Sequence, residues 1–232
     1  MITIDEITIV RDGREIIYDY SEQIPAGSIT VIVGPNGCGK STLLAAIAGD
    51  IAPDKGTITI DDLHPILNSA STLASIRAMA VQNQRFTLGF TVREMIEMAG
   101  DSTHVIDALG LAEIADRLVT TLSGGEAQRV AIAQAIAQKT PVLLLDEPLA
   151  AQDIYSRRKI ISLLQNLAET GTTVVVVAHS TETELTWADK VIKQLHSLRP
   201  GLCKAGMQRQ FINFFNSYPT DFVGLIIYLV SN

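Results

Sequence analysis

The sequence predicts an α/β fold with a central, mainly parallel sheet, and three observations point to it. Residues 142–145 are continuously apolar, and in residues 172–178 two threonines lead into five apolar residues, as expected for strands that a parallel sheet buries on both faces. A third apolar run, residues 29–33, leads through a glycine-rich stretch into a helical pattern. Because helical segments alternate with these runs, we expect an open α/β sheet with functional residues at its strand ends.

Composition narrows the class of protein. At 232 residues and 47% hydrophobic, the chain can bury a full core in one domain. A net charge of −7 with no Lys/Arg block argues against a nucleic-acid partner. No apolar run approaches the roughly 20 residues of a membrane span, and Met1 to Glu6 do not form a signal peptide. We therefore expect any membrane role to be exerted from outside the bilayer.

The N-terminal part of the chain predicts an antiparallel β layer. Isoleucines in residues 2–9 indicate a half-buried strand with a bulge near Glu6. Asp12 and Gly13 are typical of a two-residue hairpin turn, after which residues 15–18 are expected to form a second strand. Further strands are expected at residues 28–33, 57–60 and 78–81.

Residues 85–139 predict an inserted helical subdomain. Two capping boxes, at residues 91–94 and 123–126, mark helix starts within it. A further helix is expected at residues 154–169, before the apolar strand that ends at His179.

These elements predict a domain at residues 1–197, followed by a tail at 198–232. The tail concentrates apolar residues in a segment with few charges. Three interpretations stay open for it: a helix and strand packed on the core, a docking surface for a partner or membrane, or a segment foreign to the ancestral fold.

The glycine-rich stretch that follows the apolar run 29–33 predicts a phosphate-binding loop. A strand, such a loop and a helix in this order are typical of P-loop NTPases, so we expect that fold. Its glycines allow backbone N–H groups to approach phosphate oxygens, and the following helix directs its positive end at the same anion. Lys40 can reach the β- and γ-phosphates of ATP, and the Ser41 hydroxyl can bind Mg²⁺. The predicted ATP-binding residues are Gly34, Pro35, Asn36, Gly37, Cys38, Gly39, Lys40, Ser41 and Thr42.

Three polar residues at strand ends complete a predicted catalytic site. Asp146 follows four apolar residues, so we expect its carboxylate to hold Mg²⁺ beside Ser41. Glu147 is expected to polarise the attacking water, and His179 to position that water and the γ-phosphate.

The run from Leu122 to Glu126 reads Leu-Ser-Gly-Gly-Glu, and with the phosphate loop, Gln82 and the strand-end residues it resembles the nucleotide-binding subunits of ABC transporters. The resemblance covers about residues 1–195. The resemblance implies a signature motif that binds the γ-phosphate of the ATP held by a second subunit. Two subunits would then enclose two nucleotides between them. The motif residues are Ser123, Gly124, Gly125 and Glu126.

The resemblance also assigns two loop residues. Gln82 matches a glutamine that senses Mg²⁺ and the γ-phosphate and that moves with the groove in which the membrane subunit docks. Asp153 matches the aspartate of the D-loop, which communicates between the two ATP sites. Two positions depart from the family. Arg11 stands where an aromatic residue usually stacks on adenine, although a guanidinium plane can stack too. The D-loop reads Ala-Ala-Gln-Asp at residues 150–153, where the family more often has serine or threonine and leucine.

The resemblance implies an ATPase subunit that powers transport through an integral membrane permease, either as a homodimer or paired with a related ATPase. Its motifs look most like those of importers of iron chelates, haem and cobalamin. A solute-binding protein is expected as an indirect partner, and the cytoplasmic face of the cell membrane as the location. A soluble ABC-type ATPase without a permease, or a defective subunit that only binds ATP, remain alternatives.

Overall fold

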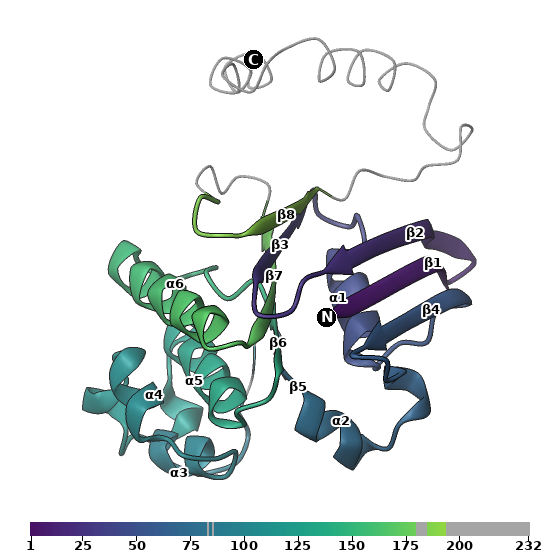
Figure 1. Cartoon of the computed structure of the whole chain (residues 1–232). Coiled ribbons are helices and arrows are strands. Elements are labelled where there is room, and N and C mark those ends of the chain that lie inside the picture. The colour runs from purple at the N-terminus through teal and green to yellow at the C-terminus, as the bar shows by residue number, and fades with distance from the viewer. Residues whose placement is uncertain (83, 85, 180–184, 194–232) are drawn as a thin grey trace. The chain divides into compact units, whose positions relative to one another are not determined.

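A five-stranded parallel sheet forms the centre of the computed structural model, which describes residues 1–82, 84, 86–179 and 185–193. The strand order is β5-β6-β7-β3-β8 (Figure 1). Its strands are β3 (Ile29–Gly34), β5 (Arg77–Ala80), β6 (Val142–Asp146), β7 (Thr173–His179) and β8 (Lys190–Lys193). The α/β class with a mainly parallel sheet is confirmed.

Alternate residues of the central strands enter two separate hydrophobic cores. In β6, Leu143 and Leu145 point into one core, whereas Val142 and Leu144 point into the other. Strand β7 alternates in the same way. Because successive side chains of a strand point to opposite faces, both faces must be covered, and this explains the unbroken apolar runs of these strands.

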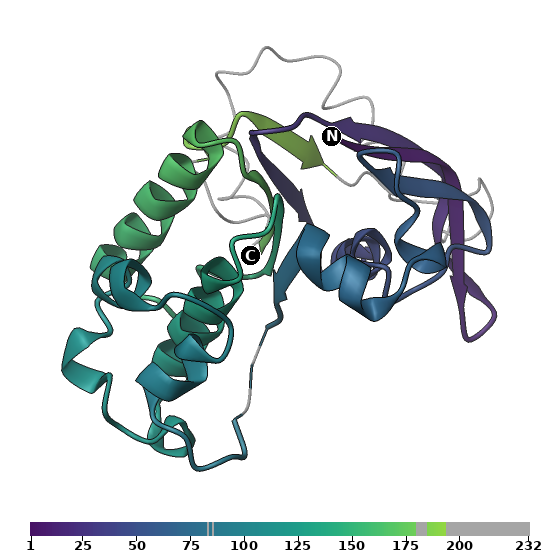
Figure 2. The same ribbon diagram turned by 60° about the horizontal axis from the view of Figure 1, so that its bottom comes forward.

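One face is covered by a three-stranded antiparallel sheet and by a helix that lies between the two sheets (Figure 2). The backbone of Glu6 has a φ of 46°, and the pairing register shifts between Ile4 and Ile7, which confirms the predicted bulge. Asp12 and Gly13 both have positive φ, as the predicted hairpin turn requires. The elements are β1 (Ile2–Arg11), β2 (Arg14–Ile24), β4 (Lys55–Ile60), in the order β2-β1-β4, and α1 (Lys40–Ala48).

Helices cover the opposite face of the parallel sheet (Figure 1). Both predicted capping boxes form, with Thr91 and Ser123 as the N-cap residues of α3 and α5. Helix α6 has the bounds that its periodicity predicts. The elements are α3 (Val92–Glu97), α4 (Thr103–Ala108), η2 (Ala112–Ile114), η3 (Val119–Thr121), α5 (Gly124–Ala137) and α6 (Ile154–Glu169).

Short elements with few buried side chains were not predicted: η1 (Pro65–Leu67), α2 (Ala70–Ile76) and β8. Helix α2 buries only Leu73, so it shows no apolar stripe, and its start depends on the Ser69 side chain, which accepts from the N–H of Thr72 at 3.2 Å. Strand β8 buries Ile192 and depends on pairing with β3. Val81, expected in a strand, lies just beyond β5 and is 42% exposed. The tail predicted at 198–232 lies outside the described residues.

Candidate active site

The glycine-rich loop connects β3 to α1 and leaves the start of the helix open to an anion. Gly37 and Gly39 have φ of 77° and 93°, a left-handed conformation that side chains disfavour. Gly39 is the N-cap residue and has no side chain with which to cap the helix. The first N–H groups of α1 therefore have no side-chain cap, which is the arrangement that binds phosphate.

Lys40 is only 6% exposed and lies folded over the loop. Its Nζ donates hydrogen bonds to the carbonyl oxygens of Gly34 at 2.8 Å and Pro35 at 3.1 Å. These contacts hold the Lys40 ammonium at the mouth of the loop. A bound phosphate can replace the two carbonyls as the acceptor, because a charged acceptor makes the stronger hydrogen bond.

Asp146, at the end of β6, meets the start of α1. The residue is 7% exposed, and burial raises the pKa of its carboxyl. A hydrogen bond from Ser41 lowers this pKa, the Glu147 charge raises it, and the Lys40 charge lowers it. Among the described residues, the buried Oδ1 atom of Asp146 has no hydrogen-bond partner. A carboxylate oxygen left without a partner beside a hydroxyl fits Mg²⁺, which prefers oxygen ligands.

Glu147 follows Asp146 and is held by backbone and side-chain contacts. Its φ is 50°, and its N–H donates to the carbonyl of Val177 in β7 at 3.0 Å. The Gln82 Nε2 atom donates to the Glu147 Oε2 atom at 2.5 Å. The structure thus brings together two residues that lie 65 positions apart in the chain, and both were predicted for one site.

His179 ends β7, where its backbone pairs with Gly34 at the start of the phosphate loop. This register places the residue at the sheet edge that also carries Asp146. Its side chain lies outside what the structure describes, so its contact with the γ-phosphate stays a prediction.

Ser123 and Gly124 lie exposed at the start of α5. The Ser123 Oγ atom accepts from the N–H of Glu126 at 3.3 Å, and Glu126 Oε2 accepts from the N–H of Ser123 at 2.8 Å. The Ser123 N–H is the main cause that lowers the pKa of Glu126. Helix α5 packs in one core and α1 in the other, so the two motifs lie on elements that cover opposite faces of the sheet.

Asp153 caps α6, with its Oδ1 and Oδ2 atoms accepting from the N–H and Oγ of Ser156 at 2.9 and 2.8 Å. These hydrogen bonds, with the Ser156 N–H first, lower the pKa of Asp153. The residue before it, Gln152, is buried against α5 and contacts Gly125 and Arg129. In the sequence, Gln152 stood out only as a departure from the family pattern. No sequence pattern pointed to a role for Arg129.

Arg11 is exposed at the end of β1, next to the hairpin turn. Its Nη1 atom donates to the carbonyl of Val10 at 3.3 Å. This hairpin belongs to the antiparallel sheet, whereas the phosphate loop follows a strand of the parallel sheet. Stacking of Arg11 on a nucleotide base stays a prediction.

Comparison with known protein families shows the family to which the chain belongs. A family model described as "ABC transporter" matches residues 17–150, more than half of the chain. The chain belongs to the ABC transporter family. Residues of its phosphate loop, its signature turn and the Asp146–Glu147 pair all fall inside the matched segment.

Individual ABC proteins match a longer part of the chain than the family model does. The hemin import ATP-binding protein of Rhodococcus jostii is 38% identical over 202 residues, covering 81% of this chain and 69% of the relative. The cobalamin import ATP-binding protein of Halobacterium salinarum is 38% identical over 198 residues, covering 78% of this chain and 49% of the relative. The chain is therefore an importer-like ATP-binding subunit of an ABC transporter.

Solved ABC cassettes share the fold. A dimeric bacterial ABC transporter cassette has a TM-score of 0.72 and 28% identity, covering 84% of this chain and 95% of that chain. A post-hydrolysis dimeric cassette with ADP and Pi bound has a TM-score of 0.71 and 27% identity, covering 83% of this chain and 94% of that chain. The ABC subunit is thus an ATPase that binds adenine nucleotides.

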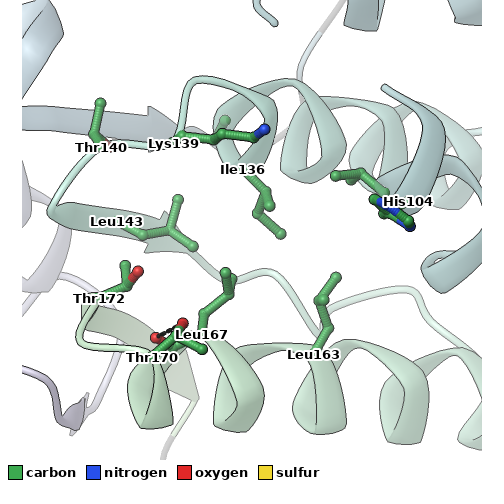
Figure 3. Close-up of a pocket in the computed structure, with 11 residues that line it drawn as sticks. His104, Ile136, Lys139, Thr140, Leu143, Leu163, Leu167, Thr170 and Thr172 are labelled. Atoms are coloured by element: carbon green, nitrogen blue, oxygen red, sulfur yellow. Dashed lines mark hydrogen bonds between the residues drawn. The ribbon is translucent and has the colours of Figure 1, made fainter. Parts of the chain in front are cut away.

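A cavity of about 350 Å³ lies apart from these ABC motifs. Figure 3 shows Ile136, Leu143 and Leu163 converging on it from α5, β6 and α6. Two polar groups at its rim, the Thr140 and Thr170 hydroxyls, already donate to backbone carbonyls at 2.8 and 2.9 Å. None of its lining residues was predicted for the site. In the part of the chain that the structure describes, no helix is long and apolar enough to cross a membrane.

Proposed function

We propose that this subunit hydrolyses ATP to drive uptake of haem, or of a related iron chelate or cobalamin-like compound, through a membrane permease. The main observation in support of ATP hydrolysis is the hydrogen bond between Ser41 and Asp146 at the phosphate loop. The contact between Gln82 and Glu147, the residue after Asp146, supports it further. The hemin and cobalamin import relatives support the solute class.

Lys40, Ser41 and the backbone N–H groups of the phosphate loop have distinct roles in this proposal. Lys40 exchanges its two carbonyl partners for the β- and γ-phosphates of ATP. The N–H groups at the start of α1 bind the same phosphates. Ser41, Asp146 and Gln82 would hold Mg²⁺, which would supply charge neutralisation at the phosphates. The Oδ1 atom of Asp146, which is buried and has no hydrogen-bond partner among the described residues, would be one of its ligands.

Glu147 is proposed to orient and polarise the attacking water. Gln82 donates to this carboxylate, and this contact supports a shared role of the two residues at the nucleotide. His179 is assigned to the γ-phosphate because its backbone pairs with Gly34, the first residue of the phosphate loop. General-base catalysis of this kind typically contributes about 10²–10⁴-fold to the rate.

The complete ATP site is proposed to need two subunits, either two copies of this chain or one paired with a related ATPase. Ser123 and Gly124 are exposed at a helix start and lie on the other side of the sheet from α1. They are therefore free to contact the ATP held by a second subunit, where the N–H groups at the start of α5 bind the γ-phosphate. Asp153 and Arg11 keep their predicted roles in linking the two sites and in stacking on the base.

The permease is proposed to dock on a groove of about 370 Å³ in the helical subdomain. Phe90 and Met98 line the groove together with Glu94 and Glu97. Met98 is 57% exposed and Leu88, two residues before Phe90, is 59% exposed, so this part of the subdomain offers apolar surface. This surface faces the permease at the cytoplasmic side of the membrane, and the solute-binding protein acts through the permease alone.

Growth of a deletion strain tests the solute class. The strain is supplied in turn with hemin, a ferric siderophore, or cobalamin as the limiting nutrient. We expect loss of growth on hemin, restored by the native chain and not by Lys40→Ala. Loss on one of the other two nutrients would reassign the solute, whereas normal growth on all three would rule out this import function.

A further inference from the structure

Gln152 joins the D-loop to the signature turn through both ends of its amide. The side chain is 7% exposed. Its Nε2 atom donates to the carbonyl oxygen of Gly125 at 3.0 Å, and its Oε1 atom accepts from Arg129 Nη1 at 3.0 Å. A carbonyl can only accept and a guanidinium can only donate, so the two partners determine the orientation of the amide.

The contact also depends on close backbone approach. A Cβ atom added at Gly125 would lie 3.0 Å from the carbonyl oxygen of Ala151, and 3.6 Å from Gln152 Nε2. Ala151 has a φ of 56°, so the loop turns sharply just before Gln152. The glycine of the signature turn thus provides the space into which the D-loop packs.

Further hydrogen bonds tie the bridge to the start of α6. Arg129 Nη1 lies 3.5 Å from Ser156 Oγ, and Ser156 in turn donates to the carboxylate of Asp153. The backbone carbonyl of Gln152 accepts from Arg157 Nε at 3.2 Å. The network therefore runs without a break from Gly125 in the signature turn to Asp153 in the D-loop.

We infer that Gln152 is a positioning residue that makes the signature turn and the D-loop of one subunit move as a single unit. The inference rests on the proposed function, in which Ser123 and Gly124 act on the nucleotide of the second subunit. The family more often has leucine in this loop, but in this chain a leucine at position 152 could make neither hydrogen bond and would leave Arg129 Nη1 with its 3.5 Å contact to Ser156 Oγ. The turn would then lose its fixed place, and the closed dimer would become harder to form.

The test measures ATP-dependent dimerisation in the Glu147→Gln background, which is expected to retain ATP. Sedimentation with MgATP compares the parent, Gln152→Leu, and Gln165→Leu as a control at an exposed position of α6. We expect Gln152→Leu to raise the dimer dissociation constant about tenfold, because the variant loses one hydrogen bond to a neutral carbonyl and one from the charged Arg129, and with them the fixed place of the turn. The control, and the affinity of each monomer for a fluorescent ATP analogue, should stay within about twofold of the parent.

A second variant separates positioning from folding. Gln152→Glu keeps the acceptor for Arg129 and the size of the side chain, but it cannot donate to Gly125 when ionised. We expect its thermal unfolding to match that of the parent while its dimerisation is weakened. Parent-like dimerisation by either variant would overturn the inference. A parent that shows no ATP-dependent dimer would instead refute the proposed function, and the inference with it.

Discussion

Asp146 combines burial with a negative charge that the described residues compensate only in part. Lys40 is close enough to lower the pKa of this carboxyl, yet burial is the larger cause and raises it. A divalent cation would resolve this conflict, because a buried carboxylate oxygen with no hydrogen-bond partner among the described residues is suited to bind one. The residue should therefore reduce stability in the ligand-free chain.

Asp146→Asn should raise the melting temperature of the ligand-free chain at pH 7 and abolish ATP hydrolysis. Because burial raises the native pKa above the unfolded value, the cost of the charged form is present above the native pKa. This cost is lost as the pH falls through the native pKa toward the unfolded value of about 3.9. Calorimetry from pH 4 to 8 without nucleotide tests this, and a stabilisation that persists unchanged at pH 4 would contradict it.

Glu147→Gln should leave ATP binding intact and lower the hydrolysis rate by about 10²-fold or more. The amide keeps the size of the side chain but cannot take a proton from water. Gel filtration with MgATP should show a trapped dimer, whereas Lys40→Ala, as a control, should fail to bind ATP at all. Hydrolysis at the native rate would remove Glu147 from its assigned role.

Arg11→Tyr should tighten adenine nucleotide binding by about 1–3 kcal/mol if Arg11 occupies the stacking position, since a base stacks more strongly on an aromatic ring. Titration calorimetry with ATP measures the change. Arg14→Tyr, on the opposite side of the same hairpin turn, serves as the control. Equal affinity of the Arg11 variant and the native chain would show that the base stacks elsewhere.

At the scale of elements, local chemistry decides where helices and turns begin. The capping boxes of α3 and α5 and the Asp12–Gly13 turn each form within a few residues, so their sequence patterns are enough to predict them. The pairing of β1 with β4 is different, because it joins segments that lie far apart in the chain. Gly56 lies against the bulge at Glu6, where a Cβ atom would be 2.3 Å from the Asp5 carbonyl oxygen.

Gly56→Ala should destabilise the fold by about 2–5 kcal/mol, because it adds a backbone clash to a φ of 74°. Gly13→Ala is a matched control, since its φ is 73° but no atom of the described residues lies within 4 Å of a Cβ atom there. The control should cost only about 1 kcal/mol for the left-handed backbone. Urea unfolding compares the two, and equal losses would show that the bulge can adjust to the methyl group.

At the scale of the whole molecule, the residues assigned to the site all lie before position 180, and the described cores end at Ile192. A chain that ends at Ser197 should therefore unfold cooperatively and bind ATP like the full chain. Thermal unfolding and nucleotide titration of both chains test this. Joint loss of cooperative unfolding and of ATP binding would show that residues 198–232 complete the core, which is the first of the three interpretations of the tail.

The sequence by itself determined the fold class, the phosphate loop and the family, because these depend on short-range patterns: buried apolar runs, glycines before a helix, and capping boxes. Only the tertiary structure decided which distant residues meet. The Gln82–Glu147 contact depends on β5 and β6 being neighbours in the sheet, and the Gln152 bridge depends on how the D-loop packs on α5. Strand β8 likewise forms because β3 offers it an edge, with too few apolar residues of its own to predict it. Contacts between segments far apart in the chain follow from strand order and packing, and no local pattern encodes those.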